Sequence, residues 1–280
     1  MANDLRAADL AIGIDFGGSG IKGAVVNIRT GEFVGDRIRI PTPQPSVPRE
    51  VVTVMDTLVR RLTEALAAGG HGLDETDLKS LPVGVGVPAA TRNGQVLTAA
   101  NIDQAWIGFQ AEKELELAIT RTVAIGNDAD VAGLAELKFG SGRGQNGTVI
   151  VLTIGTGMGT ALFTDGHLLP NTELGHLEFH GRDVEERVAE SGRDRFGLNW
   201  KEWAAGFNDY LLLMERLLWP DLFILGGGAS KRSDNYMQYL TVKTPVVIAT
   251  LKNNAGIVGA AWMAHERKSR VAVSMAGEFF

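Results

Sequence analysis

The chain has 280 residues, of which 45% are hydrophobic and 21% charged, a composition typical of a globular protein and not of a disordered one. Its net charge of −6 argues against a broadly basic nucleic-acid-binding surface, and the lack of cysteine excludes disulfides, a thiolate zinc site and a cysteine nucleophile. No uncharged apolar stretch is long enough to span a bilayer, and Asp4, Asp9 and Asp15 interrupt the first apolar runs, so we expect a cytoplasmic protein without membrane or nucleic-acid partners.

The first third of the chain predicts an α/β lobe that opens on a glycine-rich turn. A compact apolar run over 10–14 ends at an aspartate, and further extended segments follow over 21–27 and 33–40. Apolar residues at helical spacing predict a helix over 52–66. Beyond it, valine alternates with glycine over 83–87, which predicts a buried strand that another backbone approaches closely.

A second strand–glycine–strand pattern near residue 155 repeats the one near residue 15, which points to two similar α/β lobes. We expect a smaller N-terminal lobe over 1–126, to which a helix over 255–267 returns, a larger C-terminal lobe over 127–254, and a tail over 268–280. In the second round the pattern predicts strands over 122–126, 148–154, 222–225 and 246–249, a strand ending at Phe163, helices over 129–139 and 199–218, and a helix after residue 228.

Three glycine-rich loops follow predicted strands, at 17–20, 155–159 and 226–228. Such loops let backbone N–H groups approach a phosphate without a side-chain clash, and although each alone is more often a turn, the three together predict phosphate binding. The P-loop pattern is absent. Residues 18–23 match the dinucleotide fingerprint, but the residues after them are β-prone where that fingerprint must open a helix, so a dinucleotide site is not expected.

Five motifs in order resemble those of the ROK sugar kinases, within the actin-like ATPase superfamily. They are residues 15–22 for the first phosphate motif, with Ser19 where threonine is commoner, Gly126-Asn127-Asp128-Ala129 for the catalytic segment, Gly155–Gly159 for the second phosphate loop, Glu173-Leu174-Gly175-His176 for the hexose-binding motif and Gly226–Gly228 for the adenosine-side loop. Within the family, residues 170–178 and 222–231 look closest to the polyphosphate glucokinases, of the polyphosphate/ATP-glucomannokinase type.

The resemblance implies an actin-like, ribonuclease H-like α/β fold of two duplicated lobes with a cleft between them. It also implies transfer of a phosphoryl group from polyphosphate, ATP or both to the 6-hydroxyl of glucose, with mannose as a further acceptor, in a monomer or homodimer. Mg²⁺ is the implied cofactor. Most ROK proteins carry a cysteine-rich zinc motif after the hexose-binding segment, but the polyphosphate branch lacks it, so no structural zinc is implied.

The resemblance also assigns roles to single residues. By position alone Asp128 suits the cap of the helix that follows it, whereas the resemblance makes it the base that accepts the proton of the sugar hydroxyl. Asp15 is expected to orient Mg²⁺ through water, or else to form a turn beside the glycines. The sugar is expected to contact Asn101, Asn127, Asp128, Glu173, His176 and a carboxylate after Gly181, for which we choose Glu185 over Glu186. The phosphates are expected at Asp15, Gly17, Gly18, Ser19, Lys22, Gly155, Thr156 and Gly157, and the nucleotide at Gly227 and Gly228.

Three other interpretations remain open at this level. One is a strictly ATP-dependent ROK hexokinase. Another is a sugar-sensing ROK regulator, which is disfavoured because such regulators carry a helix-turn-helix domain before the first strand and only nine residues precede Leu10. A dinucleotide-dependent oxidoreductase depends on the fingerprint already discounted.

Overall fold

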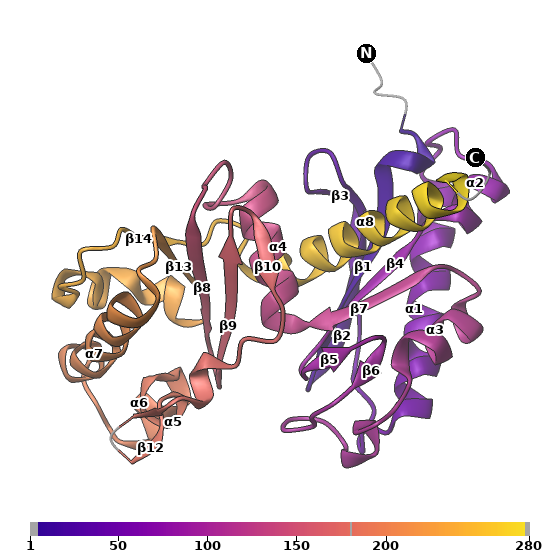
Figure 1. Cartoon of the computed structure of the whole chain (residues 1–280). Helices are drawn as coiled ribbons and strands as arrows, with labels where there is room; N and C mark the ends of the chain where they lie inside the picture. Colours follow the sequence, from indigo (N-terminus) through magenta and orange to yellow (C-terminus); the bar gives the residue numbers. More distant parts are fainter. Residues whose placement is uncertain (1–4, 180, 278–280) are drawn as a thin grey trace. The chain divides into compact units, whose positions relative to one another are not determined.

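The structure, a computed structural model, describes residues 5–179 and 181–277, which form two compact units (Figure 1). One unit comprises the described parts of Met1–Ala135 and Asn254–Phe280, and the other comprises those of Glu136–Asn253. The division falls inside helix α4 (Asp128–Phe139), whereas the sequence pattern places it near Gly126. Each unit is built on one five-stranded sheet.

The sheet of the first unit has the strand order β3-β2-β1-β4-β7. Its first three strands form an antiparallel meander, and β4 pairs parallel with both β1 and β7. The predicted strands of this unit are confirmed, with the bounds β1 (Leu10–Gly17), β2 (Gly20–Asn27), β3 (Glu32–Ile40), β4 (Val83–Val87) and β7 (Val123–Asn127). A short hairpin of β5 (Thr91–Arg92) and β6 (Gln95–Val96) lies apart from this sheet.

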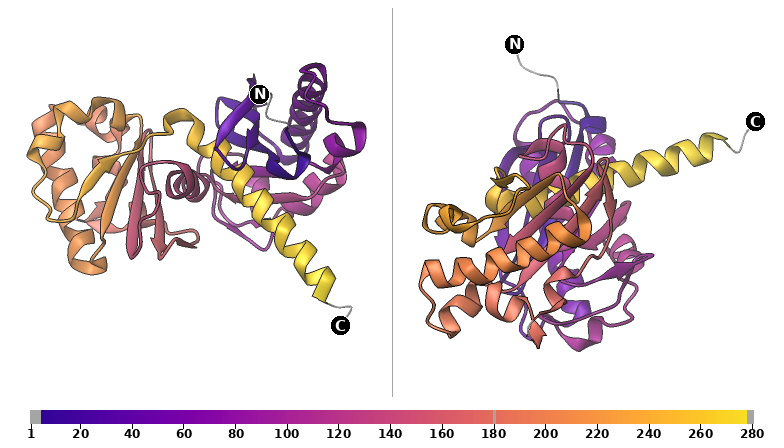
Figure 2. Two further views of the ribbon diagram at one scale, coloured as in Figure 1. Left: turned by 90° about the horizontal axis from the view of Figure 1, so that it is seen from above. Right: turned by 60° about the vertical axis from the view of Figure 1, so that its left-hand side comes forward.

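Helices cover both faces of the first sheet, with α1 and α8 on opposite sides (Figure 2). Helix α1 begins at Pro48, where the fixed φ and the missing N–H of proline suit the first turn, and it buries an apolar stripe that includes Met55, Leu58 and Leu62. The described helices of this unit are η1 (Ala7–Asp9), α1 (Pro48–Ala68), α2 (Glu75–Ser80), η2 (Gln104–Trp106), α3 (Ala111–Ile119), the start of α4 and α8 (Ala255–Gly277).

The valine–glycine alternation of β4 separates these two faces. Its three valines belong to the hydrophobic core that also contains the stripe of α1. Its glycines face the other way, where a Cβ on Gly84 would lie 1.7 Å from the carbonyl oxygen of Ala260 in α8. On β1, a Cβ on Gly13 would lie 1.9 Å from the carbonyl oxygen of Ile257. The predicted close approach of a second backbone is therefore confirmed, and that backbone is α8.

The sheet of the second unit has the order β10-β9-β8-β13-β14 and repeats the pattern of the first. Here β8, β9 and β10 form the antiparallel meander, and β13 pairs parallel with β8 and β14. The bounds are β8 (Thr148–Ile154), β9 (Met158–Thr164), β10 (His167–Leu169), β13 (Leu222–Gly227) and β14 (Val246–Ile248), with a separate hairpin of β11 (Glu178–Phe179) and β12 (Arg182–Asp183). The internal duplication predicted from the glycine loops is confirmed.

The main helix of the second unit is α7 (Trp200–Leu218), which agrees with the predicted helix. The Asn199 side chain caps it by accepting hydrogen bonds from backbone N–H groups, and the Glu202 carboxylate accepts the Asn199 N–H. Its buried face carries Trp203 and Phe207, whose rings contact Tyr236. The shorter helices are η3 (Leu174–His176), α5 (Glu185–Val188), α6 (Glu190–Arg195), η4 (Ala229–Asn235), η5 (Met237–Tyr239) and η6 (Lys252–Asn254).

Two segments differ from the sequence prediction. The helix expected after residue 228 is the 3₁₀ helix η4, in which Arg232 departs from helical dihedral angles. Helix α8 continues through Gly277, whereas the pattern ends it near residue 267; residues 278–280 of the predicted tail lie outside the described residues. Among the described helices, none combines the length and hydropathy that a membrane span requires.

Candidate active site

The carboxyl edge of the first sheet gathers the acidic residues predicted for catalysis. Asp15 on β1 stands opposite Gly86 on β4, and Gly86 in turn stands opposite Gly126 on β7. The backbones at 15 and 126 are therefore about two strand spacings, or roughly 10 Å, apart. Asp128 opens α4 directly after β7, and a Cβ on Gly86 would lie 3.7 Å from its Cα. The tight contact of such a Cβ would be with Val131 Cγ2 of α4, at 2.8 Å, so glycine at 86 leaves room for this side chain.

The cap of α4 is the side chain of Asn127. Its Oδ1 accepts the N–H groups of Ala129 at 2.9 Å and Asp130 at 3.1 Å, and its Nδ2 donates to the Ala89 carbonyl at 3.4 Å. Asn127 is buried, whereas Asp128 is exposed and accepts the Ala129 N–H at 2.8 Å. The buried amide thus provides the cap that position alone suggested for Asp128.

The first glycine turn joins β1 to β2 and stays close to the acidic edge. Lys22 Nζ lies 3.3 Å from Asp15 Oδ2, so the lysine predicted to face a phosphate pairs with the aspartate predicted to face magnesium. A Cβ on Gly18 would lie 3.9 Å from the carbonyl oxygen of Asn101, and a Cβ on Gly256, in the first turn of α8, would lie 3.4 Å from Asp15 Cγ.

The first unit therefore brings together one half of the predicted site. Its members are Asp15, Gly17, Gly18, Ser19, Lys22, Asn101, Asn127 and Asp128. The remaining predicted residues, from Gly155 to Gly228, belong to the second unit.

The second glycine turn, between β8 and β9, is tied to Glu185. The Met158 N–H donates to Glu185 Oε2 at 3.1 Å, and a Cβ on Gly157 would lie 3.0 Å from the same oxygen. Glu185 Oε1 lies 3.8 Å from Nδ1 of His176. The carboxylate chosen from the sequence thus lies between the phosphate turn and the hexose motif of this unit.

The hexose motif itself forms the 3₁₀ helix η3, held closely against β9. A Cβ on Gly175 would lie 2.4 Å from the Met158 carbonyl oxygen, so only glycine fits there. The hydroxyl of Thr160, which is 2% exposed, accepts the Leu174 N–H at 3.0 Å and donates to the Thr172 carbonyl. These contacts hold the motif against β9.

His176 of the motif pairs with a carboxylate that lies outside the motif. Its Nδ1 lies 3.0 Å from Asp183 Oδ2. This hydrogen bond raises the pKa of His176, the charges of Glu185, Glu173 and Asp183 add to the shift, and burial opposes it. Because the pKa is raised in the folded state, the stabilisation is complete below the ordinary histidine pKa and is lost as the pH rises through the raised value.

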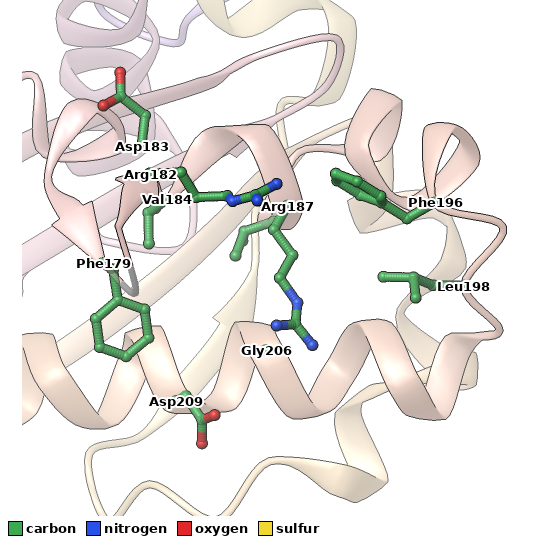
Figure 3. A pocket seen from close by; sticks show the side chains of 10 residues that line it. Phe179, Arg182, Asp183, Val184, Arg187, Phe196, Leu198, Gly206 and Asp209 are labelled. Carbon is green, nitrogen blue, oxygen red and sulfur yellow. The ribbon is translucent and has the colours of Figure 1, made fainter.

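Asp183 also lines a pocket of about 390 Å³ within the second unit (Figure 3). Phe179, Arg182 and Arg187 lie on its walls, and Arg187 extends toward Gly206 of α7, where a Cβ would lie 3.1 Å from the Arg187 Nε. The pocket therefore borders the segment that carries the histidine of the hexose motif.

The third glycine loop ends β13. Gly227 has a φ of +76°, and a Cβ there would lie 2.3 Å from the Ile154 carbonyl oxygen, so this position needs glycine on both counts. A Cβ on Gly228 would lie 2.3 Å from Glu190 Oε2. The predicted nucleotide loop thus lies beside the carboxylate of Glu190, which the sequence analysis did not predict as a site residue.

Two residues that the sequence analysis missed are Asp183 and Thr160. Asp183 follows Gly181, in the stretch where a carboxylate was sought, but nothing in its spacing distinguishes it from the glutamates after it. Thr160 is one of several threonines in apolar strands, and its contact with the hexose motif spans a separation that no local pattern reports.

Comparison with known proteins identifies the family of the chain. The ROK family model matches residues 11–193. The chain is 44% identical over 250 residues to the polyphosphate glucokinase of Mycobacterium tuberculosis (strain CDC 1551 / Oshkosh), an alignment that covers 89% of each chain. It is 42% identical to the polyphosphate glucokinase of Mycobacterium leprae (strain TN), covering 89% of this chain and 72% of that one.

Solved structures of similar proteins point to the same family. The inorganic polyphosphate/ATP-glucomannokinase of Arthrobacter sp. strain KM matches with a TM-score of 0.83 and 43% identity over 92% of this chain and 99% of that one. A ROK family glucokinase from Streptomyces griseus, solved with glucose and AMPPNP, shares the fold with a TM-score of 0.73 at 23% identity, over 92% and 99% of the two chains. The predicted actin-like α/β fold is confirmed, and the chain belongs to the ROK family.

Proposed function

We propose that this chain is a hexose kinase that transfers a phosphoryl group from inorganic polyphosphate or ATP to the 6-hydroxyl of glucose. The observation that carries the proposal is the 44% identity to a polyphosphate glucokinase over 89% of both chains. The similarity to a polyphosphate/ATP-glucomannokinase supports mannose as a further acceptor.

In this proposal Asp128 is the general base. Its carboxylate is exposed at the start of α4, and the buried Asn127 cap supports the backbone on which it stands. As the glucose O6 attacks the terminal phosphorus of the donor, the carboxylate takes the O6 proton. The bond from that phosphorus to its bridging oxygen breaks, and ADP or a polyphosphate shorter by one unit leaves. The product is glucose 6-phosphate.

Binding of the sugar is assigned to polar groups of both units. In the second unit, Glu173, His176 and Glu185 are suited to sugar hydroxyls, since carboxylates accept hydrogen bonds and the imidazole can donate from the nitrogen that Asp183 does not engage. In the first unit, Asn101 and the carboxylate of Asp128 complete the proposed set. The Asn127 amide acts mainly through the position of α4, since its oxygen is occupied by backbone N–H groups.

The glycine turns at 17–20 and 155–159 are assigned to the phosphates and the loop at 226–228 to the nucleotide. Phosphoryl transfer needs mostly positioning and charge stabilisation, which backbone N–H groups at such turns supply. Mg²⁺, when bound, neutralises charge on the donor phosphates. Asp15 fits this ion, because its carboxylate is partly exposed at the sheet edge and magnesium takes few carboxylates while keeping several waters.

The remaining parts of the proposal concern partners and location. The proposed partners are glucose, mannose, ATP and polyphosphate, with no nucleic acid or membrane among them. We place the enzyme in the cytoplasm as a monomer or homodimer, on the kinship with glucokinases alone.

The test is formation of glucose 6-phosphate from polyphosphate and Mg²⁺ with nucleotide-free reagents, followed by the same assay with ATP. We expect product with polyphosphate, and we expect Asp128→Asn to lower kcat by about 10²- to 10⁴-fold while glucose binding persists. Product with ATP alone would replace the proposal by a strictly ATP-dependent hexokinase. No product with either donor, together with tight glucose binding, would favour a sugar-binding protein without kinase activity.

A further inference from the structure

The first glycine turn is held by side chains from one neighbouring segment. Three successive carbonyl oxygens of the turn each accept a hydrogen bond from a residue at the end of β3 or just after it. The pairs are Thr42 Oγ1 to the Gly17 oxygen at 2.6 Å, Gln44 Nε2 to the Gly18 oxygen at 3.1 Å and Arg39 Nη2 to the Ser19 oxygen at 2.7 Å. The sequence analysis predicted none of these three residues as part of the site.

These bonds determine where the N–H groups of the turn point. A peptide unit is planar and trans, so a fixed carbonyl oxygen also fixes the N–H of the next residue, on the opposite side of the unit. Holding the oxygens of Gly17 and Gly18 therefore orients the N–H groups of Gly18 and Ser19. Glycine peptides rotate more freely than others, so a turn of this composition needs outside contacts to keep one orientation.

Each contact is specific in its own way. Thr42 is only 6% exposed, so water cannot readily replace its hydroxyl as a donor to Gly17. The Arg39 guanidinium covers the turn so closely that a Cβ on Gly20 would lie 2.4 Å from Nε. A side chain at position 20 would therefore displace the Arg39 guanidinium from the turn.

Arg39 also adds charge. It stands opposite Lys22 in the pairing of β2 with β3, and Lys22 is engaged with Asp15. Within the part of the chain that the structure describes, no carboxylate lies within ion-pair distance of Arg39, whose side chain bonds only the Ser19 oxygen. Its positive charge is thus available beside the turn.

The glycine loops of the second unit use the same device with different residues. There the Gly155 oxygen accepts the Glu190 N–H at 2.9 Å, the Thr156 oxygen accepts the Ser191 hydroxyl, and the Gly227 oxygen accepts the Ser230 hydroxyl at 2.7 Å. Carbonyl oxygens of all three glycine loops therefore accept hydrogen bonds from nearby donors, and the first turn follows this common pattern.

We propose that Arg39, Thr42 and Gln44 are positioning residues for the phosphoryl donor: they hold the peptide units of the 17–20 turn so that its N–H groups face the donor phosphates. The proposal rests on the proposed phosphoryl transfer for the identity of the ligand. It assigns the donor side of the reaction, and not glucose binding, to these three side chains.

The central experiment compares Thr42→Val with Thr42→Ser. Valine has the shape of threonine without the donor, and serine keeps the hydroxyl. We expect Thr42→Val to lower kcat/KM for polyphosphate and for ATP by about tenfold with the glucose Kd unchanged, and Thr42→Ser to stay within about twofold of wild type. Thr53→Val is the matched control, because Thr53 lies on the exposed side of α1 and its hydroxyl bonds only the Arg49 carbonyl.

Arg39→Met and Gln44→Ala give a second route if Thr42→Val does not fold, since both side chains are exposed. Each is expected to raise the KM for the donor and to leave the glucose Kd unchanged. Arg39→Met is also expected to weaken the salt dependence of the KM for polyphosphate, because salt screens an exposed charge, whereas Arg39→Lys is expected to retain it.

Calorimetric titration with inorganic triphosphate separates this proposal from the proposed function. Weaker triphosphate binding by Thr42→Val and Arg39→Met than by wild type would support the positioning role even if no glucose 6-phosphate forms. Equal binding by wild type and all three donor-removing variants, or no triphosphate binding by wild type, would overturn it. Unchanged kcat/KM for both donors in an active enzyme would overturn it as well and leave the kinase assignment standing.

Discussion

A methyl group at position 84 tests how closely α8 approaches the first sheet. The added Cβ would lie 1.7 Å from the carbonyl oxygen of Ala260 and 2.3 Å from its carbonyl carbon. Ordinary contact begins at 3.4 Å, twice the first distance, and both atoms are backbone, so no change of rotamer relieves the overlap. The strand and the helix must separate, and we expect Gly84→Ala to cost about 3 kcal/mol or more, at or above the upper end of overpacking penalties.

Thermal unfolding followed by circular dichroism measures this cost. For a chain of this size about 3 kcal/mol corresponds to a fall in Tm of roughly 10 °C. Because a Cβ on Gly256, one turn before Ala260, would already lie 3.4 Å from Asp15 Cγ, we also expect the folded fraction of the variant to lose kinase activity.

Gly69→Ala is the matched control. Its backbone has an ordinary φ of −70°, and the nearest atom to the added Cβ is in the movable ring of His71, at 2.6 Å. We expect its cost to stay within about 1 kcal/mol. The double variant Gly84→Ala/Ala260→Gly is expected to remain destabilised, since the offending carbonyl persists. A Tm for Gly84→Ala within about 2 °C of wild type, or rescue in the double variant, would refute the reasoning.

Three further predictions concern single contacts. Asp183→Asn removes the largest cause of the raised His176 pKa, so an NMR titration of the His176 ring is expected to show a lower midpoint, and an unchanged midpoint would contradict the assignment. Thr160→Val removes the hydroxyl under the hexose motif and is expected to raise the KM for glucose about fivefold, with Thr160→Ser near wild type; equal values in both variants would refute this. Arg267→Met leaves the Glu112 carboxylate, already raised in pKa by burial, without the guanidinium at 2.5 Å, and is expected to cost about 2 kcal/mol in urea unfolding at pH 7.5. Because the pKa of Glu112 is raised, the carboxylate of the folded variant takes up a proton as the pH falls to 5, and the loss of unfolding free energy should become smaller. A loss that grows on acidification would contradict this prediction.

Local patterns predicted the strands and the longer helices well. Alternation and compact apolar runs predicted the strands of both sheets except the short β10, and the 3.6-residue spacing predicted α1 and α7. The shorter α3 (Ala111–Ile119) went unpredicted, because nine residues with Glu112 on the buried side give a weak helical pattern. Helix α8 proved longer than predicted, since its later turns lack the apolar period that marks its beginning.

The sequence likewise predicted some features of the candidate site and missed others. The glycine loops and Asp128 could be placed from the sequence, because they follow directly on strands whose pattern is strong. Position alone suggested Asp128 as the cap, and the structure gives most of this role to Asn127: both residues are good caps, and the burial of the amide and the exposure of the carboxylate separate them. The sequence also predicted that a backbone approaches β4, but not that this backbone is α8.

By itself, the sequence therefore determined where most strands lie along the chain, the three glycine loops and the motifs of the ROK family. These features depend on residues that are neighbours along the chain. The tertiary structure alone decided that Asp183 pairs with His176, that Thr160 supports the hexose motif and that Arg39, Thr42 and Gln44 hold the first turn. The contacts with the first turn join residues about 20 or more positions apart. They depend on strand register and on how helices and loops pack on each sheet, which no local period encodes.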